Sequence, residues 1–516
     1  MNKDTEIDMK EVELNEVDPE KQPMTSDGQA SGGEKNGSVK LKVPEDEVTF
    51  TGLSKEELMK VAGTPGWVRT RWVLLVLFWL GWVGMLAGAI VIIVQAPRCK
   101  PIPEMNWWNE GPLYQISDLN TFSEDGGLQG VEEKLDNVNQ LKVKGLIFGP
   151  FHSVQADMPV TLNLQKIDGT QGETEHLAKI IEKAHKKGIK VVLDLTPNYL
   201  GSPAWFASSA NEDTLEKVMA AAEYWLGLGV DGIKISELNV PTSSPDWTKV
   251  RNAIQGNRTD GTKSRVLMGV VKGFSASGVS QLVNTSGVDL VLSDLLSSNN
   301  GGVERIKAMD TLHLQQGSLG WGLGAAQRGH LSKAATTPAL IRLYQLLLFT
   351  MPGTPVFTYG DEIGLQAGQV SYQTKWEFMF HWQVSQKLTF VVLFSENANR
   401  TEHVAVRKWF RSLSDLRGKE RSLLHGDYYP LFVSNTSLSF LRLWDQSDRY
   451  ITAVNWGNTK ETLKLQLAPT EGVELPETAK VKLSTDDSLE VDSFVSLDDL
   501  ILGPGQAVLL QFPYSA

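Results

Sequence analysis

One uncharged apolar run, residues 72–94, constrains the fold of this chain more than any other feature. The run reads WVLLVLFWLGWVGMLAGAIVIIV and contains no acidic or basic residue. A helix of this length rises far enough to cross a hydrocarbon core of about 30 Å. The N-terminal residues MNKDTEIDMK are charged rather than apolar, so they do not resemble a cleaved signal peptide. We therefore predict that residues 72–94 form a transmembrane signal-anchor helix.

Glycosylation sequons indicate which side of the membrane each part of the chain occupies. Basic residues flank the run on both sides and give only a slight positive-inside preference. One Asn-x-Ser/Thr sequon, at Asn36, precedes the run, and the others follow it. Those that follow begin at Asn257, Asn284, Asn399 and Asn435. We predict a single-pass type II membrane protein that is glycosylated at these four residues and has its C-terminal part outside the cell.

Residues 1–71 are predicted to form a disordered cytoplasmic tail. Residues 1–49 contain no aromatic side chain and are rich in Glu, Asp, Lys, Ser and Gly, so they cannot bury enough apolar surface to fold. The stretch LSKEELMKVAG, residues 53–63, has helical spacing, with Ser54 as an N-cap and Glu57 three residues later. This pattern favours a short amphipathic helix near the inner leaflet, and a flexible tail with transient helicity is the alternative.

The apolar run carries small residues at the spacing of a helix-packing face. Gly84 and Gly88 form a GxxxG pair, and Gly81 lies one turn earlier. Such residues let a second membrane helix approach closely, although glycine is also common in membrane helices generally. One span without polar side chains cannot form a transport pathway alone. A membrane partner is therefore one reading of this helix.

The neck, residues 95–104, contains the single cysteine of the chain, Cys99. Pro97 and Pro101 flank it, so this segment is expected to be non-regular and exposed. An unpaired cysteine outside the cell favours a bond to another chain, whereas the usual alternative is a small buried side chain. The net charge of −12 argues against a nucleic-acid-binding protein. The sequence shows no metal-ligand spacing and no phosphate-binding loop, so no cofactor or metal is predicted.

Residues 105–425 alternate short apolar runs with amphipathic helical stretches, which predicts an α/β fold. The candidate strands lie within residues 111–119, 143–151, 188–196, 229–236, 264–271, 287–295, 317–324 and 353–361. Eight strand–helix repeats indicate a closed (β/α)8 barrel of the TIM type. After about Gly426 the helical period disappears, and residues 426–516 are predicted to form a small antiparallel β-sandwich domain.

Several motifs of this barrel resemble the α-amylase family of glycoside hydrolases, in the family's order. They are WWNEGPLYQISDLNTF, KIDGTQGETEHLAKIIEKAHKKGIKVVLDLTPN and MPGTPVFTYGDEIGL, which resemble the first strand, the approach to the third strand and the eighth strand. The resemblance implies a barrel whose active site would use a carboxylate nucleophile and a carboxylic acid.

The residues that this resemblance would make catalytic are replaced. In GVDGIKIS, which resembles the nucleophile motif GxDGxRxD, Lys234 stands at the arginine position and Ser236 at the nucleophile position. Val270 and its neighbours stand where the general acid is expected. Asp194 and Asn198 survive after the third strand, but Tyr199 replaces the expected histidine, so we interpret them as structural remnants. No catalytic residue is predicted, and the head is not expected to be an enzyme.

The chain also lacks the extra domain that the enzymes carry after their third strand. A membrane-anchored, amylase-like head without this domain resembles the 4F2-type heavy chains of heteromeric amino-acid transporters. The resemblance implies that Cys99 bonds a multi-spanning light chain, which the heavy chain stabilises and brings to the plasma membrane. It also implies integrin β subunits as further partners in adhesion signalling. The alternative is a membrane-anchored α-glucosidase-like hydrolase.

Overall fold

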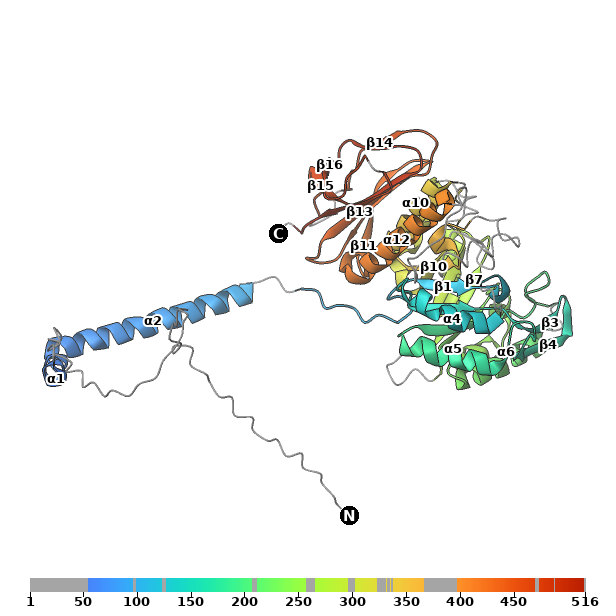
Figure 1. Ribbon diagram of the computed structural model, residues 1–516, viewed down its shortest axis with the longest axis horizontal. Helices are drawn as coiled ribbons and strands as arrows, with labels where there is room; N and C mark the ends of the chain where they lie inside the picture. The colour runs from blue at the N-terminus through green and yellow to red at the C-terminus, as the bar shows by residue number, and fades with distance from the viewer. Residues whose placement is uncertain are drawn as a thin grey trace, which may run out of the picture. The chain divides into compact units, whose positions relative to one another are not determined.

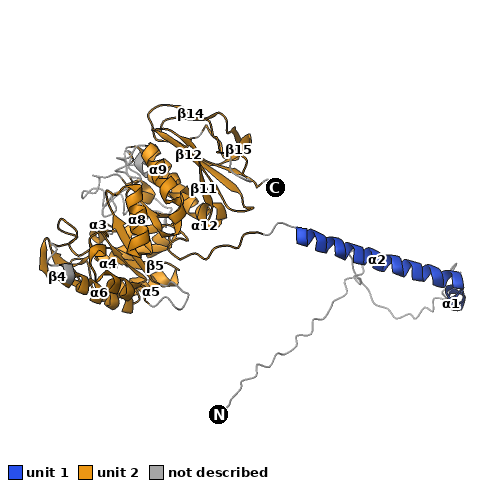
Figure 2. Cartoon of the chain, turned by 180° about the vertical axis from the view of Figure 1, so that it is seen from behind, with its two compact units in different colours: residues 1–97 blue, residues 98–516 orange. Residues whose placement is uncertain are grey.

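The computed structural model describes residues 54–95, 99–122, 127–206, 211–256, 265–295, 302–322, 331, 335, 337–365, 397–468, 473–486 and 488–514. The chain divides into two compact units, residues 1–97 and 98–516 (Figure 2). Residues 1–53 of the predicted disordered tail, 1–71, lie outside the described residues. The rest of that range is largely helical, because residues 55–62 form a capped helix and residues 65–71 form the start of the long apolar helix.

The described part of the first unit consists of two helices. Helix α1 (Lys55–Ala62) begins with a capping box, in which the Glu57 amide donates to Ser54 Oγ at 3.4 Å and the Ser54 amide donates to Glu57 Oε2 at 3.2 Å. Helix α2 (Pro65–Gln95) contains the whole apolar run and extends it toward the N-terminus, because Pro65 suits the first turn of a helix. Within the described residues it is the one helix long and apolar enough to cross a membrane.

The second unit contains a closed barrel of eight parallel strands, which confirms the predicted fold class (Figure 1). Every candidate strand segment of the sequence contains one of these strands. In chain order they are β1 (Leu113–Ile116), β2 (Gly145–Phe148), β5 (Lys190–Asp194), β6 (Gly232–Ile235), β7 (Val266–Val271), β8 (Leu290–Ser293), β9 (Leu319–Trp321) and β10 (Thr354–Thr358). Strand β1 pairs with both β2 and β10 and so closes the barrel.

Helices connect the strands and cover the outside of the barrel. They are α3 (Leu119–Phe122), α4 (Gly127–Asn139), α5 (Thr174–Lys186), α6 (Asn211–Gly227), α7 (Trp247–Gln255), α8 (Ala276–Ser286), α9 (Gly302–Leu312), α10 (Pro338–Thr350), α12 (Asn397–Lys419) and α13 (Arg421–Leu424), with the 3-10 turns η2 (Pro241–Ser243), η4 (His313–Ser318) and η6 (Asp361–Ile363). Side chains from the strands fill the barrel interior, among them Met268, Val270 and Leu292, so the barrel has a packed core and not a pore.

A repeated tripeptide fixes the lower end of the barrel. Gly-Val-Asp precedes both β6 and β8. Asp231 Oδ2 accepts a hydrogen bond from the Val191 amide at 2.9 Å, and Asp289 Oδ2 accepts one from the Leu267 amide at 3.0 Å. Each carboxylate therefore ties its own strand to the preceding one. This end of a TIM barrel serves stability rather than catalysis.

An antiparallel hairpin, β3 (His152–Gln155) and β4 (Met158–Ile167), follows β2 and was not predicted from the sequence. Its outer strand alternates exposed and more buried residues from Met158 onward, as expected for a hairpin with one solvated face. This alternation is the signal that could have identified it.

The C-terminal residues form a six-stranded antiparallel sheet and a two-stranded sheet, as the fold-class prediction required. The larger sheet contains β11 (Asp427–Val433), β12 (Ser437–Leu443), β13 (Arg449–Asn455), β18 (Gln506–Phe512), β15 (Thr478–Ser484) and β16 (Phe494–Ser496) in that spatial order, and the smaller one pairs β14 (Glu461–Leu463) with β17 (Leu500–Leu502). Every residue of β12 and β13 is buried. Phe440 and Tyr450 belong to the large hydrophobic cluster that includes the helices around the barrel, whereas Leu441 and Ile451 pack with residues of the smaller sheet.

Two buried arginines bind carbonyls at the C-terminal end of α10: Arg417 lies on α12, and Arg442 lies on β12 and joins the C-terminal sheet domain to the barrel. Arg417 donates to the carbonyls of Phe349, at 2.6 Å, and Met351, at 3.1 Å. Arg442 on β12 donates to the Thr350 carbonyl at 2.8 Å. These carbonyls lie at the C-terminal end of α10, where helix carbonyls lack partners and the helix dipole favours a cation. Burial lowers the pKa of Arg417 to about 10 and that of Arg442 to about 9.

Candidate functional site

The mouth of the barrel is where a TIM-barrel enzyme would place its catalytic groups, at the carboxyl ends of the strands. Asp194 ends β5, Lys234 lies in β6, Ser236 follows β6, and Val270 lies in β7. The structure therefore brings the sequence-predicted positions to neighbouring strands.

Lys234 and Asp194 form a buried ion pair across β5 and β6. Lys234 Nζ donates to Asp194 Oδ2 at 2.7 Å, and the two side chains are 0% and 2% exposed. Asp194 Oδ1 also accepts hydrogen bonds from the amide and the hydroxyl of Thr196. Both carboxylate oxygens are therefore used inside the protein. Asp194 therefore links the ends of β5 and β6 through its protein partners.

Ser236 and Val270 cannot replace the missing acids. The Ser236 amide donates to Thr196 Oγ1 at 3.1 Å, and its carbonyl accepts from Trp205 Nε1 at 2.8 Å. Its hydroxyl is buried and has no hydrogen-bond partner among the described residues, so no base activates it. Val270 is fully buried in the barrel interior and offers no proton donor. The geometry has neither a nucleophile nor a general acid at these positions.

Asn198 and Tyr199 anchor the β3–β4 hairpin. Asn198 Nδ2 donates to Asp157 Oδ1 at 2.8 Å, and Asn198 Oδ1 accepts from the Asp157 amide at 2.9 Å. Tyr199 donates its hydroxyl to the His152 carbonyl at 3.2 Å. Burial lowers the pKa of His152 to about 4, so this histidine is neutral at physiological pH. These contacts favour a structural role for both residues.

Two buried acids, Asp361 and Glu362, follow β10 within the motif MPGTPVFTYGDEIGL, and no role was predicted for them. Glu362 accepts from the Tyr114 hydroxyl at 3.0 Å and from the Gly360 amide at 2.8 Å. Asp361 accepts from the amides of Leu331, at 2.7 Å, and Thr358, at 2.8 Å. Burial raises the pKa of Asp361 to about 8 and that of Glu362 to about 7. Such shifts can mark active sites, but all four oxygens are occupied by protein donors here.

The other predicted residues lie away from the barrel mouth or outside the described residues, and Cys99, Asn284 and Asn435 are exposed. Cys99 is exposed and unpaired, and a side chain added at Gly81, Gly84 or Gly88 would meet nothing within 4 Å in the described chain. Asn284 is exposed on α8, and Asn435 is exposed in the β11–β12 turn. Asn399 lies in the first turn of α12, and Asn257 lies outside the described residues. Among the described residues no cluster of three or more His, Cys, Asp or Glu could hold a metal.

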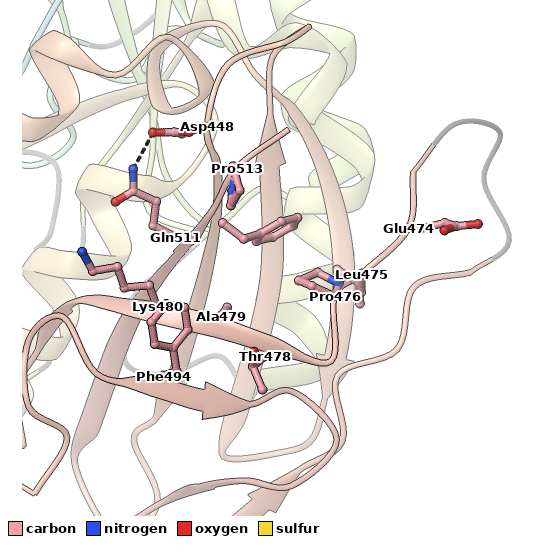
Figure 3. A pocket seen from close by; sticks show the side chains of 11 residues that line it. Asp448, Glu474, Leu475, Pro476, Thr478, Ala479, Lys480, Phe494, Gln511 and Pro513 are labelled. Atoms are coloured by element: carbon pink, nitrogen blue, oxygen red, sulfur yellow. Dashed lines mark hydrogen bonds between the residues drawn. The ribbon is translucent and has the colours of Figure 1, made fainter. Parts of the chain in front are cut away.

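A cavity of about 440 Å³ lies in the C-terminal sheet domain and not at the barrel mouth. Its wall includes Phe494 of β16, Lys480 of β15 and Asp448, and Figure 3 shows Asp448 accepting from Gln511 Nε2, at 2.6 Å. Its lining carries no pair of carboxyl groups facing each other, since Asp448 and Glu474 lie apart in Figure 3. It does not provide the two-carboxylate arrangement of a glycosidase.

The fold defines a class first: a membrane-anchored protein with an amylase-type barrel. The family model "Alpha amylase, catalytic domain" matches residues 115–218. The debranching enzyme from Nostoc punctiforme superposes with a TM-score of 0.60 at 19% identity, over 80% of this chain and 100% of that chain. At this identity the likeness shows the fold alone.

Full-length relatives then give the family. The model "Solute carrier family 3 member 2 N-terminus" matches residues 38–114. The amino acid transporter heavy chain SLC3A2 of Mus musculus is 42% identical over 540 residues, covering 100% of both chains. The heavy chain SLC3A1 of Rattus norvegicus is 22% identical over 608 residues, covering 90% of this chain and 86% of the relative. This chain belongs to the family of amino acid transporter heavy chains, as its sequence motifs predicted.

Proposed function

We propose that this protein is the non-catalytic heavy subunit of a heteromeric amino-acid transporter. It binds a multi-spanning light chain, stabilises it and brings it to the plasma membrane. The observation that carries the non-catalytic part is the buried Lys234–Asp194 ion pair beside Ser236 and Val270. A retaining glycosidase needs two carboxyl groups about 5–5.5 Å apart. Loss of a nucleophile alone removes about 10⁶-fold in rate, by analogy with a protease.

Two exposed features support the binding of a light chain. The glycines of α2 leave its backbone open to a second helix, and packing of this kind drives association where lipid removes the hydrophobic force. Cys99 is exposed in the neck. In the proposed type II orientation it would lie outside the cell, where interchain disulfides persist. The light chain would carry out the transport, since α2 contains no charged residue between Trp72 and Gln95.

The test is affinity purification of the full chain from cells in mild detergent without reductant, with mass spectrometry of the chains that co-purify. We expect a multi-spanning chain that migrates with the heavy chain on a non-reducing gel and separates on reduction. Cys99→Ser should abolish the linked band. Gly84→Leu should weaken the recovery of the partner, while Gly66→Leu, at an equally open position of α2, serves as the matched control. Recovery of no multi-spanning chain would refute the proposal.

The alternative function is that of a membrane-anchored α-glucosidase-like hydrolase, which the amylase-type fold of the barrel suggests. It predicts hydrolysis of an aryl glucoside, and a rate no higher than that of a heat-killed control ends it. The integrin-linked role suggested by the resemblance is a separate proposal. It predicts that deletion of residues 1–71 abolishes adhesion signalling while amino-acid uptake continues. Unchanged signalling after this deletion would exclude a role for the tail.

A further inference from the structure

The neck contacts the C-terminal sheet domain directly after Cys99. The Lys100 amide donates to Asp445 Oδ2 at 2.9 Å, although the two residues are far apart in the sequence. The Lys100 ammonium lies 5.7 Å from the centroid of the Trp444 ring, within cation–π range. Trp444 and Asp445 lie in the turn between β12 and β13, residues 444–448. The neck is thus held at its backbone and at its side chain by one turn.

This turn is held rigidly to the head. The Trp444 amide donates to Ser422 Oγ at 3.1 Å, and the Ser422 hydroxyl donates to the Asp448 carbonyl. The Trp444 ring lies 5.5 Å from the His425 ring. Helix α13 therefore packs against the turn through Ser422. The two strands that the turn connects, β12 and β13, are buried along their whole length. A group bound to this turn shares the rigidity of the head.

The backbone conformation of Asp445 also suits its hydrogen bond with the Lys100 amide. Its φ of 44° lies in the left-handed region, which asparagine, aspartate and glycine adopt more readily than other residues. In this position its carboxylate accepts the hydrogen bond of the Lys100 amide.

We infer that the β12–β13 turn is the docking site of the neck and fixes where Cys99 is presented to the partner chain. Asp445 and Trp444 are positioning residues for the interchain bond, and this inference rests on the proposed function of Cys99. Adjacent Cα atoms are about 3.8 Å apart, so Cys99 cannot leave the neighbourhood of the docked Lys100. The surface of the light chain around its own cysteine must then face this turn.

Docking has a physical consequence for bond formation. Joining the two thiols as a disulfide releases two protons and two electrons, which a disulfide-exchange oxidant of the secretory compartment accepts. The bond also requires the two Cβ atoms to approach to about 3.5–4.5 Å with a defined dihedral angle. A free neck would spread Cys99 over many positions, whereas a docked neck confines it and raises its effective concentration at one place. The partner's cysteine then meets a thiol that is already positioned. The expected cost of undocking is slower or less complete bonding, and not loss of the heavy chain's fold.

The first test measures whether the neck is docked on the β12–β13 turn when no partner chain is present. Cys99 is the single cysteine of the chain, so a nitroxide label on the full-length protein in detergent reports its position alone. Asp498, which is exposed, is replaced by cysteine in a second version to carry the reference label. Double electron–electron resonance should give a narrow distance distribution for the otherwise wild-type chain.

Substitutions at Asp445 separate the hydrogen bond from the turn conformation. Asp445→Gly and Asp445→Asn both suit a positive φ, but only asparagine keeps an acceptor for the Lys100 amide. We expect Asp445→Gly to broaden the distribution and Asp445→Asn to leave it narrow. Equal widths in Asp445→Gly and wild type would overturn the inference.

The second test measures the bond itself. The probe is the multi-spanning chain that co-purifies with the wild-type protein, and the readout is the rate at which the linked band forms after a pulse of synthesis. Asp445→Gly and Trp444→Ala should slow this rate about two- to fivefold each, as expected for loss of one partly exposed contact, and Asp445→Asn should not. Unchanged rates in both variants would refute the positioning role. If wild type itself forms no linked band, the proposed function fails, while the label distances still decide whether the neck is docked.

Discussion

Removing the positive charge from the barrel mouth should destabilise the head strongly. In Lys234→Met the Asp194 carboxylate keeps its hydrogen bonds from Thr196 but loses the ammonium 2.7 Å away. At an effective dielectric constant of about 20, the attraction across this distance is about 6 kcal/mol. Part of that attraction offsets the desolvation of the two side chains, which are 0% and 2% exposed. Breaking a buried pair on one side costs about 3–5 kcal/mol, and we expect a loss in this range.

The assay is urea unfolding of the full chain in detergent, followed by tryptophan fluorescence. The signal sums the 15 tryptophans of the chain, and buried ones such as Trp205, which donates to the Ser236 carbonyl beside the pair, become exposed when the head unfolds. The control is the double variant Lys234→Met with Asp194→Asn, which removes both charges. It should be more stable than Lys234→Met alone, because no unpaired charge remains buried. A single variant within about 0.5 kcal/mol of wild type would refute the view that this pair stabilises the ends of β5 and β6.

Three further outcomes follow from buried groups elsewhere in the head. Arg442→Met should cost about 3 kcal/mol or more and raise protease sensitivity, because it leaves the Thr350 carbonyl at the end of α10 without its donor; wild-type resistance would contradict this. Gly232→Ala should destabilise the barrel by about 1–3 kcal/mol in the same urea assay, because a Cβ there would lie 2.5 Å from the Val266 carbonyl oxygen; an unchanged midpoint would contradict it. Glu362→Gln should change how stability depends on pH. The folded-state pKa of Glu362 is raised to about 7, so the folded protein keeps a proton that the unfolded chain loses above about pH 4.3, and stability falls as pH rises between these values. The glutamine variant should therefore gain on wild type by about 2–4 kcal/mol between pH 5 and 8, and parallel pH profiles would contradict the reasoning.

The barrel could be predicted from the sequence because its signals are local. Each strand is a short apolar run, and even the three-residue β9 was recognised, within the seventh of the eight repeating segments. The capping box of α1 is equally local, since Ser54 and Glu57 are three residues apart. The start of α2 was placed too late, at Trp72 rather than Pro65, because the apolar run was followed and the helix-starting proline was not.

The features that escaped prediction depend on contacts between distant residues. The sequence places Lys100 and Asp445 at opposite ends of the head, and no periodicity relates them. Arg442 likewise meets the Thr350 carbonyl only after the sheet has packed on the barrel. At the mouth, the replacements Lys234 and Ser236 were recognised by resemblance, but the ion pair to Asp194 requires β5 and β6 to be neighbours in space. The loss of the carboxyl groups could be predicted from the residue types alone, whereas the ion pair between Lys234 and Asp194 could be identified only from the folded structure.

The barrel mouth lacks the carboxylates expected of a hydrolase, whereas the sheet domain contacts the neck. We therefore propose that the function of the head depends on the sheet domain rather than on the barrel mouth. A barrel mouth that hydrolyses a glycoside needs two carboxyl groups that can reach the sugar. Here Asp194, Asp361 and Glu362 all have their oxygens bound by protein donors, so the upper end of the barrel is stabilised instead. The sheet domain, whose strands β12 and β13 pack on both faces, is then the rigid support on which the neck rests. On the proposal that Cys99 bonds a light chain, the amylase-type fold would hold Cys99 in place, and the contacts of the β12–β13 turn would affect the rate of bonding more than the stability of the head.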